Sequence, residues 1–201
     1  MLITWSFTAG FCYATVGVHP CSAKHFDTHP GGPSALLSAI GDLAKNSKES
    51  GETVAFGEIG LDYDRLFLTP KDQQLKYFEA QLEVAIEVQL PLFLHSRAAS
   101  EDFERLLGAK LPQLPKKGLV HSFTGSIDEM HRLVELGLDI GVNGCSMKSR
   151  RHLWDLDWSE LTWRVQRTKI SRLSGKYLLS TYRSRLMDLG YVSHDIVKSC
   201  H

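Results

Sequence analysis

Several features that would identify a common class of protein are missing from this chain of 201 residues. Its four cysteines form no C-x-x-C pair, which excludes a cysteine-based zinc module and a dense disulfide scaffold. Lys plus Arg equals Asp plus Glu at 23 each, so no overall field attracts nucleic acid or a membrane surface. No apolar run approaches the roughly 18 residues of a membrane span. We therefore expect no membrane association, and a nucleic-acid role would need a local site.

The first eighteen residues carry no charge and faintly resemble a signal peptide. They lack the basic segment with which such a peptide begins. They also continue without a break into Gly17-Val18-His19-Pro20, which is typical of the end of a buried strand. We expect a protein that is not secreted and that is cytoplasmic or nuclear.

Short apolar runs alternate with amphipathic helical patterns over the first 149 residues. The runs are continuous and β-branched or aliphatic, as expected for strands buried on both faces. Thr69 before Pro70, and Ser126 before Glu129, have the spacing of helix N-caps. The predicted strands are 13–18, 53–59, 90–95, 118–121 and 138–142, and the predicted helices are 34–45, 71–89, 98–107 and 126–136.

This alternation predicts an α/β fold of parallel βαβ units, either a doubly wound sheet or a (β/α) barrel. A doubly wound sheet usually has a Gly-rich phosphate loop after its first strand, and no G-x-G-x-x-G or Walker loop is present. A barrel is therefore favoured. A closed barrel needs eight strands in roughly 250 residues. The sequence accordingly predicts an incomplete (β/α)8 TIM barrel.

The character of the chain changes after Arg150. Residues 150–201 hold ten Lys or Arg against five Asp or Glu, and three of the four tryptophans. Their apolar residues follow no single period. We expect two parts: a partial α/β barrel over residues 1–149, and a divergent basic tail over 150–201 that is helical or poorly ordered.

Three polar residues close successive predicted strands. Glu58, His95 and His121 each follow an apolar run and precede a loop that leads to a helix. Because parallel strands end on one face of a barrel, we expect these side chains to converge there. A carboxylate with two imidazoles suits a divalent cation such as Zn²⁺ or Mn²⁺, and the carboxylate also suits Mg²⁺. The sequence predicts one such cation site.

Further polar residues lie at the same strand ends. His19 ends the first apolar run, Asp62 follows Glu58 by four positions, and Arg97 follows His95 by two. The planar guanidinium of Arg97 can clamp a phosphate or a carboxylate, or can pair structurally with Asp62, Asp64 or Glu58. We expect His19, Arg97 and Asp62 to line a substrate site.

Five ordered blocks of this sequence resemble the TatD family of metal-dependent deoxyribonucleases, in particular its eukaryotic branch. The resemblance covers about residues 11–149. The blocks are TVGVHP (15–20), GEIGLDY (57–63), LFLHSR (92–97), VHSFTG (120–125) and IGVNGCS (140–146).

The resemblance implies a barrel of the amidohydrolase type with up to two divalent cations, and cleavage of DNA phosphodiesters, in several members from the 3′ end. By motif, Glu58 matches a bridging carboxylate, and His95 and His121 match ligands of one cation. His19 and Arg97 match polar residues near the substrate phosphate.

Two family motifs are absent from this sequence. Nothing before Tyr13 carries the His-x-His or Asp-x-Gly-x-Asn of a first strand, and no Glu-Thr-Asp occurs. The resemblance makes the Asp of that tripeptide a metal ligand and the catalytic base, so the catalytic residue here is unknown. We expect an impaired nuclease that lacks its first two βα units. Open strand edges also favour self-association.

Two other functions stay open. The chain can be a catalytically inactive truncated form or a binding remnant that uses its basic tail. It can also be a related barrel hydrolase that acts on a small ester or amide.

Overall fold

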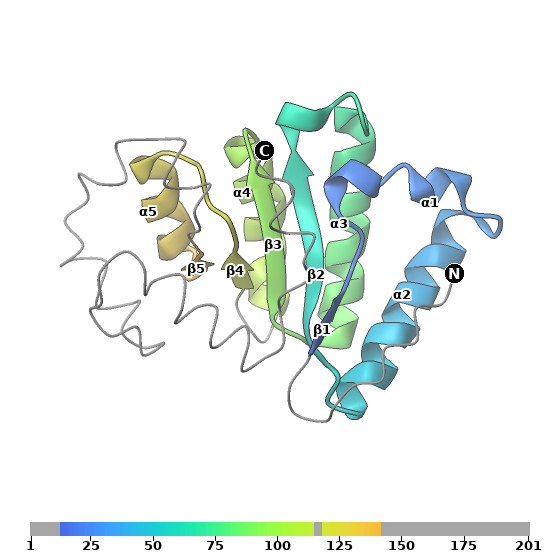
Figure 1. Ribbon diagram of the computed structural model, residues 1–201. Coiled ribbons are helices and arrows are strands. Elements are labelled where there is room, and N and C mark those ends of the chain that lie inside the picture. The colour runs from blue at the N-terminus through green and yellow to red at the C-terminus, as the bar shows by residue number, and fades with distance from the viewer. Residues whose placement is uncertain (1–12, 115–117, 142–201) are drawn as a thin grey trace. The chain divides into compact units, whose positions relative to one another are not determined.

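The structure is a computed structural model, which describes residues 13–114 and 118–141 (Figure 1). The predicted boundary between a barrel part and a basic tail, at residues 149 and 150, lies outside the described residues. The same is true of the family block over 142–146 and of both segments from which family motifs are missing. No described helix is long and apolar enough to cross a membrane.

Five strands form one sheet in the order of the sequence: β1 (Ala14–Val16), β2 (Thr53–Asp62), β3 (Leu92–Arg97), β4 (Gly118–Val120) and β5 (Asp139–Ile140). The pairs from β2 to β5 are parallel. Strand order that never reverses is the winding of a (β/α) barrel, since a doubly wound sheet changes direction at a switch point. The sheet order therefore agrees with the barrel that the sequence predicts.

The long helices follow the strands as expected. They are α2 (Gly32–Glu49), α3 (Lys71–Val88), α4 (Ser100–Lys110) and α5 (Ile127–Glu135). The shorter helices are η1 (Pro20–Ser22), α1 (His25–Thr28), η2 (Tyr63–Arg65) and η3 (Leu111–Gln113). Figure 1 shows α3 and α4 behind β2 and β3. Right-handed crossovers that all run in one direction place the helices on one face of a sheet.

Two predicted helix starts have different outcomes. Ser126 caps α5 as expected, because its Oγ accepts the backbone N–H of Glu129 at 3.2 Å. The predicted Thr69 cap of α3 is wrong, since Pro70 is the capping position and has no side-chain hydrogen bond. The Thr69 hydroxyl instead donates to the Cys21 carbonyl at 3.0 Å. Thr69 thus ties the start of α3 to the segment after β1.

The core lies between α3 and the strands. Large side chains of α3, β2 and β3 are fully buried together: Tyr77, Phe78, Leu82, Phe56, Ile59, Leu61, Leu92 and Leu94. The buried face of α3 also includes two polar residues, Gln74 and Gln81, which are 1% and 2% exposed. Leu75 and Ile86 are only half-buried. Two amides within an apolar face must find hydrogen-bond partners.

The close approach of β2 to β3 depends on glycine. Gly57 and Gly60 both have a φ of +147°. A Cβ at Gly57 would lie 2.0 Å from the Phe93 carbonyl oxygen, and one at Gly60 would lie 1.8 Å from the His95 carbonyl oxygen. No side chain fits at either position, so these glycines set the spacing of the two strands that carry Glu58 and His95.

We predict that Gly60→Ala destabilises the protein by about 3 kcal/mol or more, since it adds a backbone clash to an unfavourable φ. Gly51→Ala is the matched control, because Gly51 has a φ of +78° and open space around its Cα. That control should cost about 1 kcal/mol. Urea unfolding measures both variants, and equal losses would contradict the clash at β3.

Candidate metal centre

A bulge in β2 presents Glu58 to the site. The pairing of β2 with β3 passes from Gly57 opposite Phe93 to Ile59 opposite Leu94, which leaves Glu58 as an extra residue. A bulge turns one side chain out of the regular alternation of a strand. Here the redirected side chain is the carboxylate of the predicted site.

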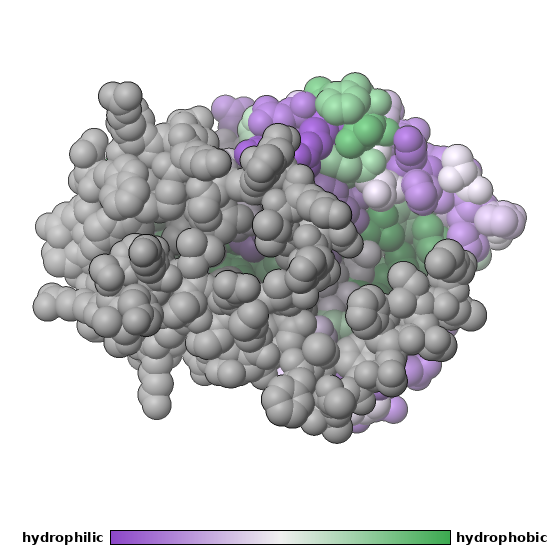
Figure 2. Space-filling view, in the orientation of Figure 1, coloured by the Kyte–Doolittle hydropathy of each residue, from purple (hydrophilic) through white to green (hydrophobic). Residues whose placement is uncertain are grey.

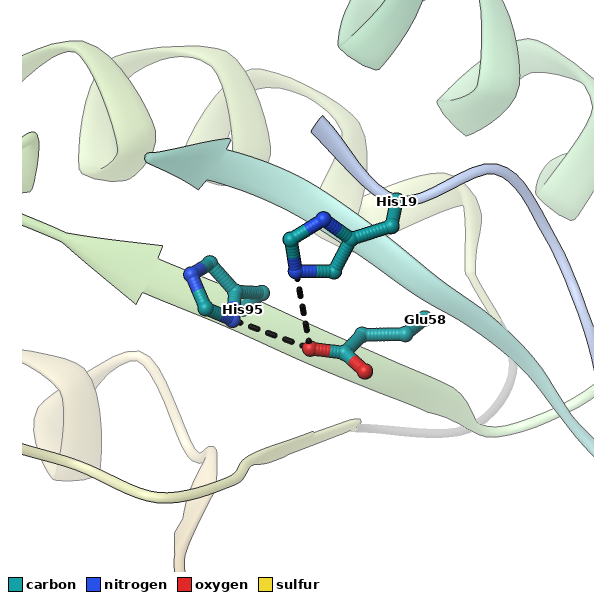
Figure 3. A group of neighbouring side chains, drawn as sticks. All are labelled: His19, Glu58 and His95. Carbon is teal, nitrogen blue, oxygen red and sulfur yellow. Dashed lines mark hydrogen bonds and ion pairs between the residues drawn. The ribbon is translucent and has the colours of Figure 1, made fainter. Parts of the chain in front are cut away.

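One oxygen of Glu58 is the common neighbour of three imidazoles. Its Oε1 lies 2.5 Å from His121 Nε2, 2.9 Å from His95 Nδ1 and 3.3 Å from His19 Nε2. Figure 3 shows the rings of His19 and His95 facing this carboxylate from two different segments of the chain. The structure therefore brings together the three predicted ligands, and it adds His19 to them.

These residues have the donor chemistry of a divalent-cation site. The ligand atoms of His19, Glu58 and His95 lie within 4.8 Å of one another. Tetrahedral ligands about 2.1 Å from an ion are about 3.4 Å apart, so small side-chain movements would admit one. The donor set fits a cation of the class expected from the sequence.

Hydrogen bonds on the far side of each ring distinguish the histidines. His95 Nε2 lies 3.1 Å from Asp62 Oδ2, and a carboxylate only accepts, so a ring with a single proton can keep it on Nε2 and offer Nδ1 to an ion. His121 Nδ1 lies 2.9 Å from the Ser122 hydroxyl, which can accept its proton and leave Nε2 for an ion. In each ring, the nitrogen that faces Glu58 can therefore exchange its proton for an ion.

His19 has the opposite arrangement. Its Nδ1 accepts the backbone N–H of Cys21 at 3.1 Å, as the N-cap of η1. A neutral imidazole carries one proton, so Nε2 holds it and donates toward Glu58. His19 is thus positioned as an N–H donor at the edge of the site, and ligation of an ion through Nε2 would break the contact with Cys21.

The structure gives Asp62 a neighbourhood different from the expected substrate surface. Asp62 is fully buried, and its Oδ2 contacts His95, Arg65 at 3.4 Å and the Cys21 thiol at 3.8 Å. Its Oδ1 is buried without a hydrogen-bond partner among the described residues. A buried carboxylate behind a histidine is placed to hold the ring rather than to meet a substrate.

Arg97 lies at the end of β3, opposite Asp62 in the strand register. Its Nε is 3.4 Å from Asp64 Oδ2, and about a third of its side chain is exposed. An ion pair between exposed side chains holds weakly, so the guanidinium can exchange Asp64 for an anionic ligand.

Burial and hydrogen bonding oppose each other in the pKa values of the site. Burial raises the pKa of Glu58, but hydrogen bonds from His121, His19 and His95 outweigh it and hold the pKa well below its ordinary range. The pKa of Asp62 is also lowered, because the hydrogen bond from His95 overcomes burial. Burial lowers the pKa of His95, and hydrogen bonds to Asp62 and Glu58 more than reverse this. Without a cation, the carboxylates favour a protonated His95.

Two buried glutamines of α3 hold the segments that carry the site. Gln81 accepts the N–H of Val18 at 2.7 Å and donates to the Val18 carbonyl at 3.1 Å, which fixes the backbone next to His19. Gln74 accepts the N–H of Asp62 at 2.7 Å and donates to its carbonyl at 2.8 Å. Sequence analysis missed both residues, although their spacing of seven places them on one helix face.

The comparisons with known proteins show the family of this chain. The family model described as "TatD related DNase" matches residues 3–156. The chain belongs to the TatD-related DNase family. The resemblance seen in the five sequence blocks is thereby confirmed.

Named relatives come from yeast and bacteria. The chain is 60% identical over 140 residues to a Schizosaccharomyces pombe protein named "Deoxyribonuclease Tat-D", covering 70% of this chain and 45% of that protein. It is 40% identical over 142 residues to a Salmonella typhimurium protein named "3'-5' ssDNA/RNA exonuclease TatD", covering 71% and 50%. The chain thus spans about half the length of these TatD relatives.

Solved structures agree with the expected fold. A Saccharomyces cerevisiae protein described as an uncharacterized amidohydrolase matches with a TM-score of 0.61 at 30% identity, over 67% of this chain and 49% of that one. A TatD family hydrolase from Entamoeba histolytica matches with a TM-score of 0.55 at 30% identity, over 68% and 45%. The fold is an incomplete (β/α)8 TIM barrel of the amidohydrolase type, as the sequence predicted.

We predict that Gln81→Met displaces His19. Methionine keeps the volume of the glutamine side chain, but Val18 loses its two hydrogen bonds to the Gln81 amide. The loss of two hydrogen bonds should cost about 1–3 kcal/mol. Ring signals of the histidines in nuclear magnetic resonance spectra of the metal-free protein should change for His19 and not for His121. Gln74→Met is the control, and it should leave His19 unchanged. Identical spectral changes in both variants would contradict the claim that Gln81 and Gln74 hold different segments of the site.

We also predict that cation affinity rises with pH. Because the pKa of His95 is raised in the folded protein, its protonated form stabilises the metal-free fold. This stabilisation is complete below the ordinary pKa of 6.5 and is lost as the pH rises through the raised pKa. A cation needs the unprotonated Nδ1, so binding releases a proton. Calorimetric titration with Mn²⁺ between about pH 6 and about pH 8 measures this. Asp62→Asn should shift the increase in Mn²⁺ affinity to lower pH. An affinity that does not change with pH would contradict the coupling of cation binding to the protonation of His95.

Proposed function

We propose that this TatD-related chain is a divalent-metal-dependent hydrolase of phosphodiesters in single-stranded nucleic acid. The observation that carries the proposal is the oxygen of Glu58 shared by the imidazoles of His95 and His121, whose facing nitrogens can bind a cation. The names of the relatives, a deoxyribonuclease and a 3'-5' ssDNA/RNA exonuclease, support DNA as the substrate and attack from the 3′ end.

We propose Glu58, His95 and His121 as the ligands of one cation, with His95 bound through Nδ1 and His121 through Nε2. A hard carboxylate with two imidazoles accepts Mn²⁺ or Zn²⁺, and Mg²⁺ with more of its water retained. When bound, such a cation polarises a phosphodiester and lowers the pKa of a water molecule toward neutrality. Asp62 has the role of orienting the His95 ring behind these ligands.

The remaining polar residues would act on the substrate. The N–H of His19 Nε2 can donate to a phosphate oxygen in place of Glu58, because its other nitrogen already accepts from Cys21. Arg97 can leave the exposed Asp64 and neutralise charge that develops on the phosphate. No Glu-Thr-Asp occurs in the sequence. We therefore propose a turnover well below that of relatives that carry this base.

We predict that Glu58→Gln lowers Mn²⁺-dependent cleavage of a 3′-labelled single-stranded oligonucleotide by at least roughly a hundredfold, since it removes the shared charge and keeps the side-chain shape. Glu87→Gln is the control, because Glu87 is an exposed carboxylate on α3 that pairs with Lys45. Gel analysis of the products also tells exonuclease from endonuclease cleavage. Equal rates for Glu58→Gln and the unmodified chain, or full activity in a chelator, would contradict the proposal.

Two further expectations from the sequence remain predictions. The first is a cytoplasmic or nuclear localisation, which is compatible with a nucleic-acid substrate. Self-association through open strand edges is tested by sedimentation of the full chain.

A further inference from the structure

Three consecutive apolar residues are exposed in the segment that follows β2 and η2. Leu66, Phe67 and Leu68 are 39%, 82% and 36% exposed, and they are named here the rim patch. Leu43 is the one other large apolar residue that is exposed in the described part of the chain. Isolated exposed apolar residues are ordinary, whereas an exposed run of them indicates a binding surface.

The rim patch is held in place from both ends. The N–H of Leu68 donates to the Arg65 carbonyl at 3.0 Å. Thr69 is fully buried, donates to the Cys21 carbonyl and accepts from Gln74 at 2.9 Å. The patch is therefore a fixed feature that loses little conformational entropy when a ligand covers it.

The patch lies at the end of the sheet that carries the metal centre. It follows β2 and η2 directly, and Figure 1 shows η2 where β2 finishes. Figure 2 shows apolar surface gathered over this turn, with hydrophilic surface beside it. Glu58 lies four residues before Asp62, the last residue of β2, and eight residues before the start of the patch. A nucleic-acid strand with one phosphate at Glu58 would carry neighbouring bases to this rim.

Cations flank the patch on both sides. Arg65 and Lys71 have side chains that are 36% and 52% exposed, and they pair with Asp62 and Asp102. An aromatic face between cations matches the alternation of bases and phosphates along a strand. Three side chains offer at most a few hundred Å², well below the roughly 800 Å² per partner of a stable protein interface. This favours a nucleic-acid strand over a second copy of the chain.

We propose that the rim patch, with Phe67 at its centre, is a base-stacking surface for a single-stranded nucleic acid whose cleaved phosphate lies at the metal centre. The inference rests on the proposed function and extends it from the phosphate to the bases. Stacking tolerates every base, so the patch would add affinity without sequence preference.

The test compares two oligonucleotides with the same number of phosphates, one with normal bases and one with abasic sites throughout. Fluorescence anisotropy of labelled strands measures their binding to the full chain in a chelator, where no hydrolysis occurs. Phe67→Ala should weaken binding of the normal strand about tenfold and leave the abasic strand unchanged. Leu43→Ala should change neither. Phe67→Trp should keep the affinity, and the normal strand should alter its fluorescence while the abasic strand does not.

The outcomes separate this inference from the proposed function. An equal effect of Phe67→Ala on both strands, or no effect on either, overturns the stacking surface. A self-associating chain that Phe67→Ala makes monomeric would also overturn it, in favour of a second copy. Base-dependent binding without metal-dependent cleavage would support the stacking surface and overturn the proposed hydrolase, whereas cleavage that is insensitive to the bases and to Phe67 would do the reverse.

Discussion

The site depends on one oxygen atom, Oε1 of Glu58, which three imidazoles approach within hydrogen-bonding or ion-pair distance. A carboxylate that is largely withdrawn from water needs such partners, because burial alone would raise its pKa and neutralise it. The bulge in β2 turns Glu58 toward these rings, and glycines on either side of it let β2 and β3 approach closely. The fold of this part of the barrel is therefore coupled to one charge.

The outer hydrogen bonds decide what each imidazole can do. Asp62 behind His95 and the Ser122 hydroxyl behind His121 leave the inner nitrogens free for a cation, whereas the Cys21 amide leaves His19 with a proton to donate. Proximity alone groups His19, Glu58 and His95. The hydrogen-bond roles favour His121 over His19 as a ligand, because a neutral ring cannot accept on one nitrogen and ligate through the other. The structure thus supports different roles for three rings that all contact the same carboxylate oxygen.

Much of this arrangement follows from the sequence. The apolar runs before Glu58, His95 and His121 predict parallel strands with their ends on one face, and the structure brings the three side chains together. The predicted strand end at Glu58 is wrong, because β2 continues to Asp62 and a bulge turns Glu58 toward the site. The buried glutamines Gln74 and Gln81 were not predicted from the sequence. A glutamine within a helical pattern is assigned to the polar surface unless the backbone groups that it binds are known. The sequence predicts Asp62 at the substrate site, and only the packing shows that it is buried behind His95. Thr69 has the sequence of a helix cap but bonds to Cys21, a contact between segments 48 residues apart.

The central claim is that a single cation joins Glu58 to His95 and His121. X-ray absorption of the zinc-loaded full chain measures this most directly, since multiple scattering counts the imidazoles around the ion. The account predicts two imidazoles in the unmodified chain, one after His121→Ala, and two after His19→Ala. A spectrum without imidazole ligands, or one that loses a ligand with His19→Ala and keeps both with His121→Ala, would contradict it.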